Sequence, residues 1–542
     1  MRSWAVGEVG TTFQSPLSTD FFTFLFENDL KACCSELFLV VASIILLMYG
    51  VIGSTSARKG YPLMLTNISW LALGSLFLSF FLIWSSPLSR GCLFYNSLVI
   101  DDFTAFLKGM LLLGATLSIC ISLSGFQEEG LNSFELIILI LLSTCSMLFL
   151  ISSADFVSMY LAIEMQSLCF YVMAALKRNS EFSTEAGLKY FLLGAFSSGL
   201  LLFGCSLIYG FTGVTEFAQL GKIFTCGTEQ IYGHIQGDHT ALLENVRTPL
   251  RGCELGMIFI CVGLLFKCTA VPFHMWAPDV YEGAPTAVTA FFSIAPKIAL
   301  FAVFVRVFLS SFYDFMDPIQ KILIFSSCAS MILGALAALS QNKMKRLLAY
   351  SSIGHVGYML VGLCCGTVEG IQALLIYLAV YVAMTVNLFA IILLHLGRHD
   401  TPSTISLSPH VQRVKYTTDL AMLSGTNPLL ALSLTVMMFS IAGIPPLAGF
   451  YSKAYLFFAA MSASQYLLAF LGVITSVVSC FYYIRLVKIM YFEKSPLWCS
   501  FSRIPKSSSL PLAITFFFVI SFLIYPSPLY LATHKCALAL SF

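Results

Sequence analysis

The sequence predicts an all-α protein that crosses a membrane many times, and three observations support this prediction. Of its 542 residues, 58% are hydrophobic and only 10% are charged, and the mean hydropathy is +0.88. Soluble globular domains carry roughly 25% charged residues. Apolar segments of about 20 residues, the length of a membrane-spanning helix, recur along the whole chain. Three of these segments contain both a proline and a lysine, and we expect two of them to be broken helices.

The apolar segments predict about fourteen membrane spans. They lie near residues 36–53, 62–84, 103–124, 134–152, 155–176, 187–210, 255–276, 285–311, 319–340, 346–364, 371–396, 428–458, 465–490 and 510–530. With this count, the basic loops all fall on one side of the membrane, which supports it. Basic loop residues face the cytoplasm or the mitochondrial matrix, so both chain termini are predicted on the opposite side. The longest loop, about 212–254, also lies on that opposite side and is expected to be a solvated connector.

The spans predict two repeats of five helices each. The seventh and twelfth spans, each interrupted by proline, take the same place in the two repeats. Because five is an odd number, the repeats have opposite orientations, an arrangement found in many membrane transporters. The predicted organisation is an N-terminal extension of unknown role (1–36), three spans (37–133), the first repeat (134–318), the second inverted repeat (319–490), and a C-terminal loop with the last span (491–542).

Two lysines lie in successive apolar spans. Lys267 precedes Pro272 in the seventh span, and Lys297 follows Pro296 in the eighth. A lysine at the centre of a membrane costs on the order of 3 kcal/mol on insertion scales, so it is usually functional. No acid lies near Lys297 in its own span, and desolvation without a counter-charge favours a neutral amine. The sequence therefore predicts that Lys267 and Lys297 handle charge inside the membrane.

A carboxylate and two more lysines extend this set. Glu164 lies near the middle of the fifth span, where it would take up a proton or pair with a cation, and Lys267 has a suitable depth. A static ion pair is the alternative. Lys453 follows the helix break at Pro445 and Pro446 and is predicted to be functional. Lys189 begins the sixth span, where an interfacial lysine with its amine in the headgroup region is an equal alternative.

Two histidines could bridge the gaps between the lysines. Histidine titrates near neutral pH, so His274 and His355 are possible relay groups. A buried histidine that simply bonds a neighbouring hydroxyl is equally consistent with the sequence. The 17 cysteines form no CxxC pair or Cys/His cluster, so no metal site is predicted. No phosphate-binding or nucleophile motif occurs, and no cofactor is expected on this chain.

Several segments resemble one protein family. They are LAIEMQSLCFYVMAALKRNSEFSTEAGLKYFLLGAFSSG, FKCTAVPFHMWAPDVYEGAPT, IAPK, KRLLAYSSIGHVGY and IAGIPPLAGFYSK. Together they resemble the antiporter-like subunits of respiratory NADH:quinone oxidoreductase, and most of all the long, plant- or alga-type form of mitochondrial subunit 2. The resemblance runs from about Leu37 to the C-terminus. Residues 1–36 and the polar insert 398–412 have no counterpart that we can assign.

The resemblance implies roles for the charged residues. Glu164 matches the family's acid on helix five, and Lys267 its lysine partner on the broken helix seven. Lys297 matches the central lysine of helix eight, and Lys453 the lysine on the broken helix twelve. Lys189 looks like a further helix-six lysine found in such subunits.

The resemblance also implies the function. It predicts a membrane-arm subunit of complex I that translocates protons across the mitochondrial inner membrane, and is thus part of an enzyme that oxidises NADH. NADH, FMN, iron–sulfur clusters and ubiquinone are expected in other subunits. The expected partners are neighbouring antiporter-like subunits and membrane lipids, with no nucleic acid.

Three alternatives remain open on the sequence. A cation/proton antiporter of the same fold would need several carboxylates at one depth, and only Glu164 is clearly placed. The equivalent subunit of a plastid NAD(P)H or ferredoxin–quinone oxidoreductase would share fold and mechanism. A scaffold without proton transfer is disfavoured, since it has no need for lysines in three interrupted spans.

Overall fold

The computed structural model describes residues 29–55, 64–86, 91–128, 133–234, 240–398, 412–421, 423–493, 499–501 and 505–540. Most of the predicted N-terminal extension and most of the insert 398–412 lie outside these residues. The described chain is almost entirely helical. Its helices are α2 (Cys34–Ser54), α3 (Leu65–Trp84), α4 (Asp102–Glu128), α5 (Glu135–Ser152), α6 (Phe156–Ala174), α7 (Glu181–Thr212), α8 (Phe217–His234), α9 (Thr240–Cys268), α10 (Trp276–Gly283), α11 (Thr286–Arg306), α12 (Met316–Leu339), α13 (Met344–Cys364), α14 (Val368–Ile392), α15 (Leu423–Thr426), α16 (Pro428–Ala442), α17 (Ala448–Ser462), α18 (Tyr466–Phe492), α19 (Lys506–Ile524) and α20 (Ser527–Leu540).

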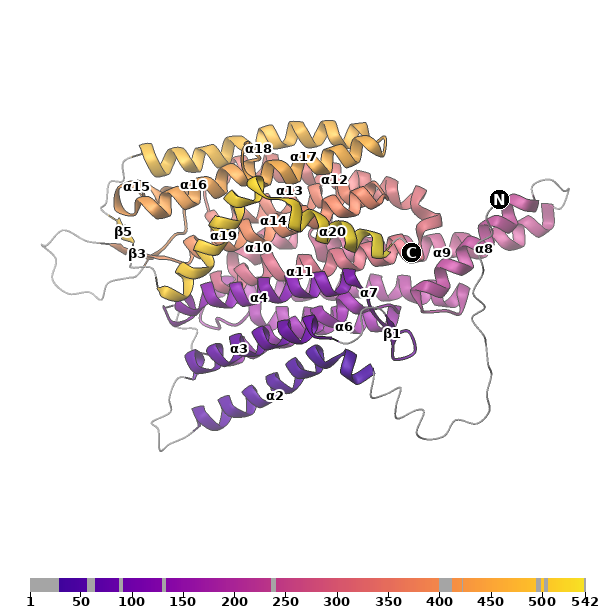
Figure 1. Cartoon of the computed structure of the whole chain (residues 1–542), viewed down its shortest axis with the longest axis horizontal. Coiled ribbons are helices and arrows are strands. Elements are labelled where there is room, and N and C mark those ends of the chain that lie inside the picture. Colours follow the sequence, from indigo (N-terminus) through magenta and orange to yellow (C-terminus); the bar gives the residue numbers. More distant parts are fainter. Residues whose placement is uncertain are drawn as a thin grey trace, which may run out of the picture.

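The predicted all-α membrane fold is confirmed. Among the described residues, twelve helices are long and apolar enough to cross a membrane. The two predicted spans that this set leaves out, 255–276 and 428–458, are the two broken ones. The first is the end of α9 followed by α10, and the second is α16 followed by α17. The helices run side by side in one elongated bundle, with α2 and α18 at opposite edges and α11 between them (Figure 1).

The two sets of five helices make corresponding contacts. In the first set α5 packs on α6 and α11, and α7 packs on α9. In the second set α12 packs on α13 and α18, and α14 packs on α16 and α17. The broken helix is the fourth member of both sets, and the odd number of members gives the sets opposite directions.

Glycines let neighbouring helices touch through their backbones. A Cβ atom on Gly204 of α7 would lie 2.7 Å from the carbonyl oxygen of Gly256 on α9, and a Cβ on Gly256 would lie 2.9 Å from that of Gly204. A Cβ on Gly334 of α12 would lie 2.6 Å from the backbone nitrogen of Gly354 on α13. Lipid is as apolar as leucine, so close packing of small residues is a main source of helix association in membranes.

The basic loops meet at one end of the bundle, as predicted. The backbone N–H of Met344 donates to the carbonyl of Lys415 (2.9 Å), and Arg485 donates to the Asn342 side chain (3.3 Å). Strand β3 (His395–Arg398) pairs with both β4 (Gln412–Arg413) and β5 (Cys499–Phe501), which joins two further loops at this end. Four other basic residues of these loops, Arg58, Lys59, Lys494 and Arg503, lie outside the described residues. Helix α2 begins and α20 ends near the other end of the bundle (Figure 1).

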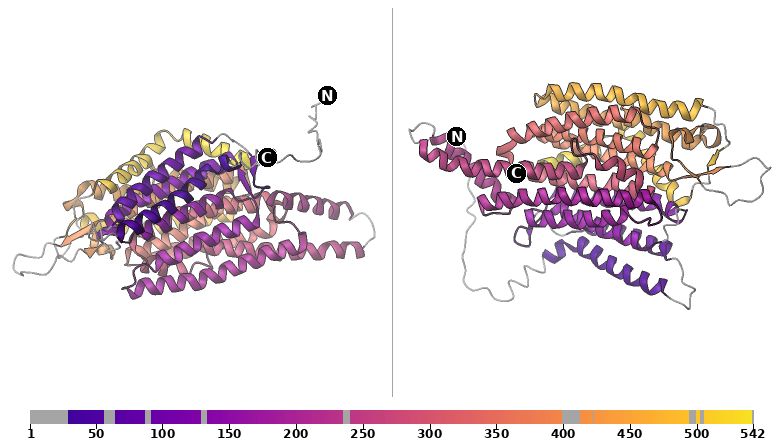
Figure 2. Two further views of the ribbon diagram at one scale, coloured as in Figure 1. Left: turned by 90° about the horizontal axis from the view of Figure 1, so that it is seen from below. Right: turned by 180° about the vertical axis from the view of Figure 1, so that it is seen from behind.

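The segment over about 212–254, expected to be a loop, is largely helical. Helix α8 runs from Phe217 to His234, and α9 already begins at Thr240. The apolar residues Phe217, Leu220 and Phe224 are spaced three and four apart, so they form one buried helix face. Phe224 packs edge-on against Phe315, with ring centroids 4.9 Å apart. These helices extend beyond the end of the main bundle (Figure 2).

The last predicted span also differs from the structure. In place of one segment near 510–530, α19 ends at Ile524 and α20 follows from Ser527 to Leu540. Pro526 lies between the two helices, where it cannot donate a backbone hydrogen bond, and Pro528 is in the first turn of α20, where proline is tolerated. Helix α20 packs on α4 and α14.

Candidate functional site

The break between α9 and α10 brings a lysine to a helix end inside the bundle. Lys267 is in the last turn of α9, and the chain leaves the helix at Thr269, whose φ is +68°. Pro272 cannot donate a backbone hydrogen bond, so the helix does not resume until Trp276. The indole Nε1 of Trp276 donates to the carbonyl of Phe266 (3.1 Å), which fastens α10 to the end of α9.

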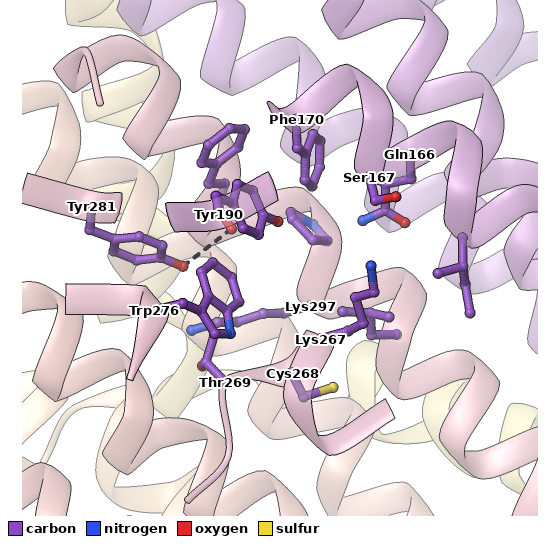
Figure 3. Close-up of a pocket in the computed structure, with 14 residues that line it drawn as sticks. Gln166, Ser167, Phe170, Tyr190, Lys267, Cys268, Thr269, Trp276, Tyr281 and Lys297 are labelled. Atoms are coloured by element: carbon purple, nitrogen blue, oxygen red, sulfur yellow. Dashed lines mark hydrogen bonds between the residues drawn. The ribbon is translucent and has the colours of Figure 1, made fainter. Parts of the chain in front are cut away.

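A cavity lies beside this break, and both Lys267 and Lys297 line it (Figure 3). Its other polar lining residues come from four elements. They are Gln166 and Ser167 of α6, Tyr190 of α7, Thr269 of the break, and Tyr281 of α10. The amine of Lys267 points toward Gln166 and Ser167 (Figure 3). Pro296 also lines the cavity.

Glu164 and Lys267 do not form a direct ion pair. Glu164 Oε1 and Lys267 Nζ are buried atoms that have no hydrogen-bond partner among the described protein atoms. Glu164 is nevertheless close enough to act on Lys267 electrostatically. Three neutral polar atoms in this region are also buried and have no hydrogen-bond partner among the described protein atoms: Gln166 Oε1, Tyr171 OH and Thr269 Oγ1. Buried polar groups of this kind are normally satisfied by water, so this region is built to hold water molecules.

Lys297 lies deep in the protein. Every residue of α11 is buried, and Lys297 itself is 3% exposed. Its Nζ donates to the hydroxyl of Tyr381 (2.6 Å) and lies 3.5 Å from the carbonyl oxygen of Ser352. No carboxylate among the described residues is within ion-pair distance of this amine. Lys297 is therefore held by neutral oxygens, which bond either its charged or its neutral form.

Lys453 binds the end of the other broken helix. Helix α16 ends at Ala442, and α17 begins at Ala448 after Pro445 and Pro446. The last carbonyls of a helix have no partner within it and carry partial negative charge. Lys453 Nζ donates to two of them, Ile441 (2.8 Å) and Ala442 (3.0 Å), and Lys453 is 5% exposed.

His355 lies between Lys297 and Lys453, within a group of tyrosines. Its Nδ1 shares a hydrogen bond with the hydroxyl of Tyr377 (2.6 Å). Its ring centroid is 5.3 Å from that of Tyr381, which binds Lys297. The His355 ring centroid is also 6.3 Å from the ring centroid of Tyr358, and Lys453 Nζ lies 5.1 Å from the Tyr358 centroid.

Two further cavities continue from the first one. The second is lined by Tyr281, Tyr381 and His355, and the third by His355, Tyr358 and Lys453. Tyr281 lines both the first and the second cavity, and His355 lines both the second and the third. The three cavities thus form one row of polar groups through the centre of the bundle.

The structure separates His274 and Lys189 from this row. His274 is half-buried in the loop between α9 and α10 and is not among the residues that line the three cavities. Lys189 lies at the basic end of the bundle, where it pairs with Glu185 (2.7 Å) and Asp279 (3.0 Å), and its side chain is 41% exposed. This position favours the interfacial alternative for Lys189.

Sequence reasoning missed the tyrosines of the row. Tyr377 and Tyr381 are four residues apart on α14, and His355 and Tyr358 are three apart on α13. Residues at these spacings share one helix face. Polar aromatic residues at helical spacing inside otherwise apolar spans are the signal that could have identified them.

Comparison with known proteins places the chain in a family. Residues 153–479 match the family described as NADH:quinone oxidoreductase/Mrp antiporter, TM. NADH-ubiquinone oxidoreductase chain 2 of Marchantia polymorpha is 56% identical over 517 residues, covering 95% of this chain and 100% of that protein. The protein of the same name from Arabidopsis thaliana is 52% identical over 516 residues, covering 95% and 97%.

Solved structures show the same fold. A chain of respiratory complex I from Thermus thermophilus superposes with a TM-score of 0.71 at 27% identity, covering 92% of this chain and 99% of that chain. A chain of the Mrp complex from Dietzia sp. gives a TM-score of 0.73 at 19% identity, covering 94% and 97%. The chain therefore belongs to the NADH:quinone oxidoreductase/Mrp antiporter membrane family, and within it to the NADH-ubiquinone oxidoreductase chain 2 proteins.

Proposed function

We propose that this chain carries protons across a membrane as a subunit of complex I, along the row of groups Glu164, Lys267, Lys297, His355 and Lys453. The observation that carries the proposal is the row of three cavities with shared lining residues, which joins the three central lysines through the bundle. Each of these lysines is held by neutral groups or lies without a direct partner, so none is locked in an ion pair.

The arrangement suggests how the transfer begins. When Glu164 is ionised, its field favours the charged form of Lys267. When Glu164 takes up a proton or its charge is compensated from outside, that support is lost and Lys267 releases its proton toward Lys297. Lys297 has no counter-charge to hold the proton, so it passes the proton on past Tyr381 and His355 toward Lys453.

The energy for this transfer comes from outside the chain. Moving one charge against a membrane potential costs about 2.3 kcal/mol per 100 mV. We propose that NADH oxidation in other subunits supplies this energy, and that NADH, FMN, iron–sulfur clusters and ubiquinone bind there. By the same reasoning, the chain lies in the mitochondrial inner membrane and works as part of NADH:ubiquinone reductase.

One face of the bundle has the properties of a contact with another membrane subunit. Glu164 is only half-buried, and its neighbours on α6, Leu161 and Leu168, are 62% and 56% exposed. Pro272 and Met275, in the break between α9 and α10, are also exposed. A carboxylate and an irregular backbone at membrane depth are stable only where protein or water covers them. We propose that a neighbouring membrane-arm subunit covers this face and that lipid covers the remaining apolar surface.

The test is the number of protons pumped per NADH oxidised by complex I in sealed vesicles. Lys267→Ala, Lys297→Ala and Lys453→Ala are compared with the parent, and native gels establish that each complex assembles. Lys321→Ala, at an exposed position near the start of α12, is the matched control. The proposal predicts fewer protons per NADH in the three central variants and an unchanged ratio in the control. Unchanged pumping in all three central variants would show that these lysines have a structural role only.

A further inference from the structure

Thr269 has an unusual backbone conformation for its residue type. Its φ is +68°, in the left-handed region where a Cβ atom approaches the backbone too closely. A β-branched residue in this region is a genuine outlier, and such strain tends to be found at functional sites. Thr269 therefore needs an explanation other than backbone preference.

The turn that contains Thr269 is a common way to end a helix. The N–H of Thr269 donates to the carbonyl of Phe266 (3.1 Å), and the N–H of Ala270 donates to that of Leu265 (3.0 Å). This pair of bonds defines the Schellman motif, in which the left-handed position is usually glycine. The turn itself requires only that this residue adopt a positive φ.

The second broken helix ends in the same motif with the usual residue. The N–H of Gly443 donates to the carbonyl of Ser440, and the N–H of Ile444 to that of Phe439, both at 3.0 Å. Gly443 has a φ of +88°. The end of α17 repeats the motif with Ser464 at φ +59°, and Ser464 is exposed. At the two other described helix ends with this motif, the position holds glycine or an exposed serine, whereas the buried threonine lies beside Lys267.

The side chain of Thr269 lies in the functional cavity. Thr269 is 3% exposed and lines the same cavity as Lys267 and Lys297 (Figure 3). Its Oγ1 is buried and has no hydrogen-bond partner among the described protein atoms. A buried hydroxyl at a polar cavity is satisfied by water. Glycine would relieve the strain of the turn, but it would remove this hydroxyl.

We propose that Thr269 is a positioning residue whose hydroxyl holds a water molecule in the cavity that Lys267 and Lys297 both line. This inference rests on the proposed relay. In the step it serves, an N–H bond of the Lys267 ammonium breaks and its proton joins the water. The proton charge then passes along the cavity water, and the last water molecule gives up a proton to form an N–H bond with the neutral Lys297 amine. The water is regenerated, and one proton has moved from Lys267 to Lys297.

Four variants of assembled complex I in vesicles test this role. Thr269→Gly relieves the strain and removes the hydroxyl, Thr269→Val keeps the branched shape without the hydroxyl, and Thr269→Ser keeps the hydroxyl. Ser464→Gly makes the same backbone change in the same motif outside the cavities. The measurements are the proton-pumping rate, the solvent deuterium isotope effect on coupled NADH oxidation, and thermal inactivation of the complex.

We expect the glycine and valine variants to pump roughly fivefold more slowly, the factor that corresponds to the loss of one ordinary hydrogen bond. Their isotope effect should rise, while the serine variant and Ser464→Gly stay close to the parent. Thr269→Gly should be at least as resistant to heat as the parent, because the strain is removed. If Thr269→Gly does not assemble, the comparison of valine with serine still tests the hydroxyl.

Two results would overturn the inference. One is parental pumping by the valine variant, and the other is a serine variant as slow as the valine variant. The variant Lys297→Ala shows whether only the role of Thr269 is wrong or whether the proposed proton relay is wrong as well. If Lys297→Ala abolishes pumping while Thr269→Val has no effect, only the role of Thr269 is wrong. If Lys297→Ala pumps normally, the relay on which the inference rests is wrong.

Discussion

Replacing Lys108 by methionine is expected to destabilise the N-terminal helices strongly. Lys108 of α4 forms an ion pair with Glu36 of α2, with Nζ and Oε1 2.5 Å apart, and the two residues are 6% and 1% exposed. The Ser35 hydroxyl donates to the other carboxylate oxygen of Glu36, also at 2.5 Å. Removing one member of a buried pair leaves the other charge without compensation, which typically costs about 3–5 kcal/mol.

The same reasoning predicts a different result when both charges are removed. The double variant Glu36→Gln with Lys108→Met leaves no buried charge, and the glutamine oxygen can still accept the hydrogen bond from Ser35. Replacing a whole buried ion pair by neutral residues is often neutral or even stabilising. The double variant should therefore recover most of the stability that Lys108→Met loses.

Thermal inactivation of complex I and its yield on native gels measure both effects. Lys321→Ala, at an exposed position, is the control for removing a lysine. The number of protons pumped per NADH by the complex that does assemble should stay at the parental value, because neither Glu36 nor Lys108 lines the three cavities. The reasoning is refuted if the double variant is as unstable as Lys108→Met, since the cost would then not come from an unpaired charge.

Three further predictions follow from packing and exposure. Gly204→Leu should lower the yield of assembled complex on native gels, because its Cβ would lie 2.7 Å from the carbonyl oxygen of Gly256 and overpacking costs about 1–3 kcal/mol or more; a normal yield would contradict this close contact. Gly443→Ala should assemble but pump more slowly, because its Cβ would be strained at φ +88° and lie 3.1 Å from Lys453 Cδ; parental pumping in vesicles would show that the position of Lys453 is not critical. Lys189→Ala should change neither thermal inactivation nor pumping, because exposed ion pairs contribute little; slower pumping by a fully assembled complex would return Lys189 to the relay.

The membrane spans and the two helix breaks could be predicted because their causes are local. An apolar segment of about 20 residues satisfies its own backbone only as a helix in a membrane, whatever surrounds it. A proline removes a hydrogen bond from its own turn, and Pro272, Pro445 and Pro446 lie at the two breaks, although α11 continues through Pro296. Helix α8 was not predicted, because its apolar face is short and lies in an otherwise polar segment.

The candidate site was only partly predictable. A lysine in an apolar span is costly wherever it points, so Lys267, Lys297 and Lys453 could be singled out from the sequence alone. The partners of these lysines could not be identified, because Tyr381 is 84 positions from Lys297 and reaches it only after the helices pack. Glu36 stood at the boundary between the predicted extension and the first span, and its pairing with Lys108, 72 positions away, could not be read from the sequence.

The sequence by itself thus determined which apolar segments form membrane-length helices, where two of them break, and that Lys267, Lys297 and Lys453 lie inside. Each of these features depends on residues within one or two helical turns. Only the tertiary structure decided which neutral groups hold each lysine, that His355 joins two cavities, and that Thr269 faces the first of them. These features arise from contacts between helices that are distant in the sequence, and hydropathy and spacing along one helix contain no information about its neighbour.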